Sequence, residues 1–290
     1  MRDSQTLRPK GRCSVSPGRK PWANENRARG EAAVPSRPGF PPRANRTTPR
    51  RGVGLWFAAV FFLAIAAPAR AAWDVRPDAP QEDFEAFHRR FSGDVYHYPR
   101  HGAAPLGLIG FEVYADVAVD QDFGGEPFVD TVLDDDPTGD LLAIGRVGVR
   151  KGLPGGIDLG VAYGRAIEGD LKFLSADIQY AIIKGGPLTP AFSLRVTGTR
   201  TLESDVYDLD QYGGELLLSK GFTVLTPYIG GGVVYSKGTL NRTIGPELEE
   251  SETQGIVYAG VTLNLLLPKI TVEVEKADVI QGAIRVGFGF

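Results

Sequence analysis

The chain ends with the heptapeptide Ile284–Phe290, IRVGFGF, and this stretch decides the fold class. Side chains alternate between the two faces of a strand, so Ile284, Val286, Phe288 and Phe290 share one apolar face and Arg285 takes the other. An apolar strand at the edge of a soluble sheet leaves unpaired backbone groups and invites aggregation. A strand that closes a membrane barrel has no free edge, because both sides are hydrogen-bonded to neighbours.

This ending resembles the C-terminal signal strand of Gram-negative outer-membrane β-barrel proteins, which finishes in an aromatic residue with apolar residues at every second position before it. The resemblance implies an all-β, antiparallel, up-and-down transmembrane β-barrel over 106–290. It also implies that the barrel-assembly machinery recognises Ile284, Val286, Phe288 and Phe290. It points to no specific family, and a fold does not by itself give a function.

Past Pro105 the apolar side chains recur at every second residue, which predicts strands. We predict ten, at 106–119, 141–150, 157–167, 171–184, 190–200, 207–220, 222–236, 254–266, 269–276 and 281–290. Short Gly/Pro turns alternate with longer polar loops at 120–140, 201–206 and 237–253, which is the outer-membrane pattern. Eight or twelve strands is the alternative count, and a soluble periplasmic barrel or sandwich is the alternative fold. With Phe290 in the periplasm, the longer loops face outward. Aromatic residues cluster near the strand ends, as an interfacial girdle would; they are Tyr163, Tyr180, Tyr228, Tyr235, Tyr258, Phe288 and Phe290.

The segment before the strands divides by composition. Residues 1–71 hold 14 Lys/Arg and 3 Asp/Glu, whereas 72–290 hold 18 and 32. We interpret 1–52 as a disordered basic leader, or as an extension from a misassigned start codon, and expect no nucleic-acid partner. We predict that 53–71 is the end of a secretory signal peptide. It contains an apolar run of about 15 residues, followed by the small-x-small cleavage site Ala69-Arg70-Ala71. Residues 72–105 are predicted to be a periplasmic segment. It contains a short helix over 81–91, where Phe84, Phe87 and Phe91 fall at helical spacing, and this helix plugs the barrel from below or lies along the membrane.

Charged residues recur on the polar faces of the predicted strands. They are Glu112, Asp116, Arg146, Arg150, Asp158, Asp177, Arg195, Glu215, Glu273, Glu275 and Arg285. A barrel of eight to ten strands is nearly filled by its own side chains, and buried charges must be paired. We therefore predict a salt-bridge network in the lumen; a narrow, charge-lined pore is the alternative.

The positions of the histidines argue against the known enzymatic sites of outer-membrane barrels. The only histidines are His88, His97 and His101, all before the first strand. Outer-membrane proteases of the omptin type, and barrels that hydrolyse lipids, use a histidine in the strands or on the rim. Their sites cannot be carried over, so we assign no catalytic residue.

The sequence also contains two weak metal signals. His97 and His101 could share an ion but lack a third ligand, and the acidic loop 120–140 does not match a calcium loop. We therefore assign no metal and no cofactor. The sequence predicts a non-enzymatic, structural or surface-interaction protein of the outer membrane, or a channel for ions or small solutes, whose surroundings are lipid and lipopolysaccharide. It does not identify an extracellular partner.

Overall fold

The computed structural model describes residues 73–134, 141–167, 169–265 and 267–290. The predictions for the basic leader, 1–52, and for the signal peptide, 53–71, lie outside these residues. Within them, no helix is long and apolar enough to cross a membrane.

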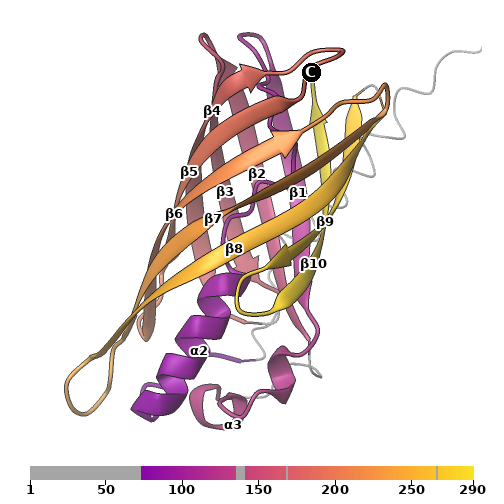
Figure 1. The fold of residues 1–290 in the computed structure, drawn as a ribbon. Helices are drawn as coiled ribbons and strands as arrows, with labels where there is room; N and C mark the ends of the chain where they lie inside the picture. Colours follow the sequence, from indigo (N-terminus) through magenta and orange to yellow (C-terminus); the bar gives the residue numbers. More distant parts are fainter. Residues whose placement is uncertain (1–72, 135–140, 168, 266) are drawn as a thin grey trace, which may run out of the picture. The chain divides into compact units, whose positions relative to one another are not determined.

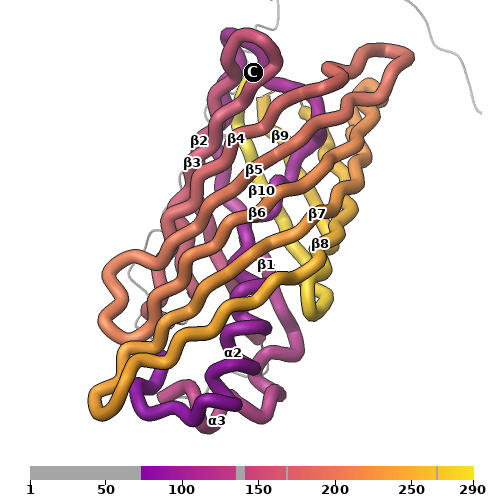
Figure 2. The backbone as a smooth tube through the Cα atoms, turned by 60° about the vertical axis from the view of Figure 1, so that its left-hand side comes forward, coloured from indigo at the N-terminus to yellow at the C-terminus, as the bar shows by residue number. Residues whose placement is uncertain are grey.

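Ten antiparallel strands close into a barrel in which each strand pairs with its neighbours in sequence and β1 pairs with β10 (Figures 1 and 2). They are β1 (Phe111–Asp120), β2 (Leu142–Leu153), β3 (Ile157–Ala166), β4 (Lys172–Lys184), β5 (Ala191–Leu202), β6 (Tyr207–Ser219), β7 (Leu225–Leu240), β8 (Leu248–Asn264), β9 (Pro268–Lys276) and β10 (Ile280–Gly289). This confirms the predicted fold class and the count of ten.

The β7–β8 hairpin is longer than the sequence suggested. The loop predicted at 237–253 is mostly strand, and only 241–247 connects β7 to β8. Polar residues continue the ladder here, with Lys237 paired to Ser251 and an ion pair of 2.9 Å between Lys237 Nζ and Glu249 Oε1. Alternating polar residues do not end a strand whose backbone groups remain paired.

The two faces of the barrel wall differ in chemistry, as the alternation predicts. Outward side chains are apolar, and Ile178, Val196, Val257, Val272 and Ile284 are 53–58% exposed. Inward positions are buried and largely polar. Such an apolar exterior belongs against lipid.

Two aromatics are placed differently from the expected interfacial girdle. Tyr228 and Tyr258 face the lumen and are 5% and 3% exposed. An inward-facing glycine follows each tyrosine two residues later, Gly230 after Tyr228 and Gly260 after Tyr258. Gly230 leaves room for the ring of Tyr258, and Gly260 leaves room for the ring of Tyr228. The rings therefore fill space inside the barrel.

The helix α2 (Gln81–Asp94) of the N-terminal segment lies at the end of the barrel opposite the C terminus (Figure 1). There it meets the β1–β2 connection, which carries η1 (Phe123–Gly125) and α3 (Val129–Val132). We call this the loop end, and the end with Phe290 and the short β2–β3 turn the turn end. If Phe290 lies at the periplasmic rim, the helix is on the outer side, not in the predicted periplasmic position.

Candidate functional site: the lumen of the barrel

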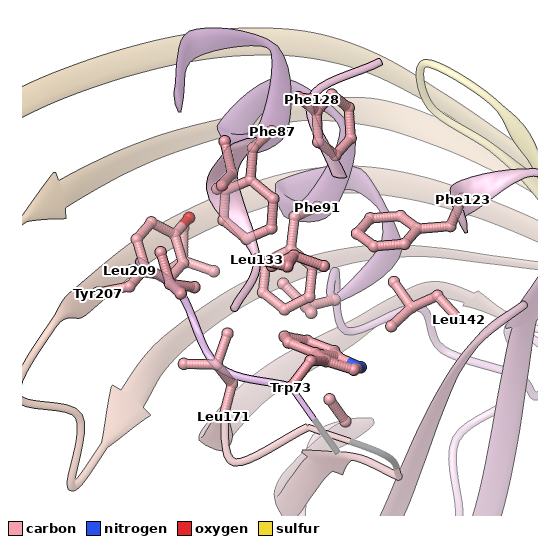
Figure 3. Close-up of a cluster of buried hydrophobic side chains, with 14 of the residues drawn as sticks. Trp73, Phe87, Phe91, Phe123, Phe128, Leu133, Leu142, Leu171, Tyr207 and Leu209 are labelled. Atoms are coloured by element: carbon pink, nitrogen blue, oxygen red, sulfur yellow. The ribbon is translucent and has the colours of Figure 1, made fainter. Parts of the chain in front are cut away.

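A cluster of buried aromatic and aliphatic side chains, which we call the cap cluster or cap, closes the loop end (Figure 3). Phe84, Phe87 and Phe91 fall on one face of α2 and are fully buried. The Phe87 ring packs edge-on against Tyr207 of β6 at 5.4 Å and against Phe128 of the β1–β2 connection at 5.9 Å, measured between ring centroids. The spacing that predicted the helix thus also supplies the apolar face that caps the barrel.

After α2 the chain enters the barrel as an irregular segment, 95–105, which we call the plug. Tyr96 and Tyr98 of the plug are fully buried inside the barrel, with their ring centroids 4.9 Å apart. Tyr98 packs edge-on against Tyr258 of β8, with 5.6 Å between the ring centroids. Gly213 of β6 faces the Tyr96 ring so closely that a methyl group there would overlap with it. An inward glycine is therefore what admits the plug at this level.

Arginines of the barrel wall satisfy the backbone of the plug. Arg146 Nη2 donates to the carbonyls of residues 95 and 96 at 3.0 and 2.7 Å. Arg195 Nη1 donates to the carbonyl of residue 97 at 2.8 Å, and Arg285 Nη1 to that of residue 99 at 2.9 Å. Buried irregular backbone requires such partners, and a guanidinium offers five donors in a fixed fork.

The plug also supplies a missing cation. The eleven charged residues predicted in the lumen comprise seven acids and four arginines, and all are at most 4% exposed. Arg100 of the plug lies between Asp116 and Glu275; its Nε and Nη2 are 2.6 and 3.0 Å from the two Glu275 carboxylate oxygens, and its Nη1 contacts Asp116. Sequence reasoning missed Arg100, although the excess of inward carboxylates was a signal that a cation was needed.

The remaining predicted charges form two further groups. In one, Arg195 contacts Glu215 and lies 3.2 Å from Asp177 Oδ1, which also meets His97 Nε2 at 3.0 Å. In the other, near the turn end, Arg285 lies 2.8 Å from Glu112, and Arg150 lies 3.1 Å from Asp158. Arg146 is 3.6 Å from Asp116. Glu273 accepts a hydrogen bond from the Tyr228 hydroxyl, and no described cation pairs with it.

Each histidine has its own partners. His88 Nδ1 lies 2.8 Å from the Tyr207 hydroxyl and its Nε2 lies 3.1 Å from Ser236 Oγ. His101 Nδ1 donates to the neighbouring carbonyl of Gly102 at 2.9 Å, so His97 and His101 share no partner. Within the described ranges, no group of three or more His, Cys, Asp and Glu side chains is arranged to hold a metal ion.

Burial shifts two pKa values at the loop end. Burial lowers the pKa of His88 from its ordinary 6.5 to about 4, so its ring is neutral at pH 7. Burial and the nearby Asp120 carboxylate raise the pKa of Asp94 well above 3.8. The neutral His88 ring can therefore bridge two hydroxyls inside the cap without burying a charge.

Comparison with known proteins gives distant structural similarities. No family model and no curated protein sequence matches the chain. The N-terminal β-barrel domain of Pseudomonas aeruginosa OprF is 14% identical, with a TM-score of 0.29, over 63% of this chain and 99% of that domain. Ail of Yersinia pestis, solved in complex with the heparin analogue sucrose octasulfate, is 13% identical, with a TM-score of 0.27, over 62% of this chain and 97% of Ail. Neisserial surface protein A is also 13% identical, with a TM-score of 0.26, over 62% of this chain and 95% of that protein. From its own geometry, the described chain is a closed ten-stranded antiparallel barrel of the outer-membrane type.

Proposed function

We propose that this protein is a non-enzymatic β-barrel of a Gram-negative outer membrane, with a structural or surface-interaction role and a lumen closed by its plug. The observation that carries the proposal is the anchoring of the plug by Arg146, Arg195 and Arg285, together with Arg100 between Asp116 and Glu275. A segment tied in this way to the neighbouring strands β9, β10, β1 and β2 and to β5 obstructs passage through the lumen.

The exterior supports a membrane location. Its apolar belt fits lipid, with lipopolysaccharide in the outer leaflet on the predicted orientation. The β7–β8 hairpin adds an exposed tip at 241–247, polar except for Ile244 and Pro246, that can meet an extracellular partner. Deleting Phe290 should reduce assembly into the outer membrane, measured as loss of the heat-modifiable folded band. Normal insertion of the shortened chain would contradict the proposed role of the closing strand.

A narrow channel is the second candidate, favoured by one observation. A cavity of about 280 Å³ enters the barrel from the turn end and reaches Arg100 in the plug. The cavity thus already occupies part of the path that a channel would need.

Conductance in planar bilayers separates the two functions. The purified wild-type barrel should give no steady conductance. Replacing Tyr96, Tyr98 and Arg100 of the plug and Phe87 and Phe91 of the cap cluster together by alanine should open a measurable pore. The control is Arg89→Ala, because the Arg89 side chain is 56% exposed on α2 and lies outside the plug. Reproducible pores from the wild-type protein would overturn the closed lumen.

A further inference from the structure

The cavity at the turn end is lined by several charged groups. Its lining includes Arg100, Arg150, Lys269 and Arg285, against two carboxylates, the side chain of Glu112 and the α-carboxylate of the terminal residue, Phe290. Arg100 is already bound to Asp116 and Glu275 deeper in the barrel. The other three cations determine what the cavity can attract.

These three cations share two carboxylates. Glu112 receives Arg285 on Oε1 at 2.8 Å and Lys269 on Oε2 at 3.3 Å. Arg150 pairs with Asp158 at 3.1 Å, and Asp158 also accepts the backbone N–H of Leu106. The α-carboxylate of Phe290, which also lines the cavity, is a third carboxylate at this end, so the cavity is distinguished by its free hydrogen-bond donors and not by a net charge.

Two of these cations also have N–H groups that donate no hydrogen bond within the described residues. Arg150 donates only from Nη2, and its buried Nε has no hydrogen-bond partner among the described residues. Lys269 Nζ has a single, long contact, although an ammonium has three protons to donate. Threonine side chains at positions 226, 262 and 271 add neutral hydroxyls to the lining.

We propose that this turn-end cavity is a binding site for a phosphate group. A phosphate group offers several acceptor oxygens to donors that converge from different strands, and guanidinium and ammonium groups form strong, charge-assisted bonds with it. The cavity's volume of about 280 Å³ lies just below the ~300–1,000 Å³ typical of small-molecule sites. It suits a small phosphate compound or a single lipid headgroup. The proposal goes beyond the proposed function and does not require the barrel to conduct or to be closed.

The test measures binding of inorganic phosphate to the folded full barrel in a neutral detergent at low salt, by calorimetry. A second arm uses nanodiscs of phosphatidylcholine with and without phosphatidylglycerol, followed by ³¹P NMR. Lys269→Gln removes one ligand from a side chain that is 24% exposed, so folding should survive. Lys184→Gln is the matched control, because Lys184 is an exposed lysine of the same end and does not line the cavity.

The expected result is saturable binding that Lys269→Gln weakens by about fivefold or more and Lys184→Gln leaves unchanged. Binding of inorganic phosphate identifies a soluble ligand, and binding seen only with phosphatidylglycerol identifies a lipid headgroup; either supports the site. Glu112→Gln, checked for folding by heat-modifiable mobility, should tighten binding because it removes the competing carboxylate. Absence of binding in both arms, or equal losses in the two lysine variants, would overturn the proposal.

Discussion

Removing the Arg100 side chain should destabilise the whole barrel. Arg100, Asp116 and Glu275 have side chains that are at most 2% exposed. Arg100→Met keeps most of the apolar volume but leaves Glu275 with no described cationic partner, while Asp116 retains Arg146 at 3.6 Å. Orphaning one buried charge costs about 3–5 kcal/mol, and we expect a loss of that size in the free energy of unfolding.

Urea unfolding in phospholipid vesicles measures this loss. Trp73 is the only tryptophan of residues 72–290 and is buried in the cap cluster, so its fluorescence reports release of the N-terminal segment. Arg89→Met is the control: Arg89 lies 3.5 Å from Glu252 on the surface, and exposed pairs contribute about 0–1 kcal/mol.

A double variant tests the cause of the loss. Adding Glu275→Gln to Arg100→Met removes the orphaned charge and should restore a large part of the stability, since the two effects are not additive when they share one interaction. A loss below about 1 kcal/mol in the single variant, on the scale of an exposed pair, would refute the view that Arg100 anchors the plug. So would a double variant that is no more stable than the single one.

Three further changes probe the plug and the cap. Gly213→Ala should cost about 1–3 kcal/mol by pressing on the Tyr96 ring, whereas Gly214→Ala, with open space around its Cβ, should cost little in the same unfolding assay. Because burial lowers the pKa of His88 to about 4, stability should fall as the pH drops from 6.5 towards 4, by up to about 3 kcal/mol, and His88→Gln should lack this component. A pH profile shared by both proteins would contradict that assignment. In a Cys13→Ser background, Asp78→Cys should react with an impermeant maleimide on intact cells and Leu188→Cys should not; the reverse would invert the orientation.

The sequence predicted the barrel because the alternation is clear within most individual strands. Alternation over 172–184 or 280–289 follows from which side chains face lipid, and no distant contact is needed to read it. The same local signal failed at 237–253, where both faces are polar and alternation no longer separates strand from loop. It also misplaced Tyr228 and Tyr258, because a tyrosine near a strand end suits both a membrane interface and a lumen.

The sequence could not predict that residues 95–105 lie inside the barrel, because this segment has no helical or strand periodicity. Its partners are carbonyl and carboxylate oxygens that only the closed barrel brings together. Inward charges such as Asp177 and Arg195 were identifiable individually, but their common contact with His97 depends on the register of three separate segments.

Charge balance nevertheless links plug and wall into one unit. With seven carboxylates against four arginines on its predicted inward faces, an empty ten-stranded wall would enclose uncompensated negative charge in a low-dielectric interior. Arg100 reduces that excess, and the wall arginines in turn satisfy the plug's carbonyls. Each part lacks partners that the other supplies, so the barrel should not reach its stable form before the N-terminal segment has entered it. Because α2 lies at the loop end and β1 begins at the turn end, the segment runs along the lumen, and we expect it to lie inside when β1 and β10 pair and close the wall.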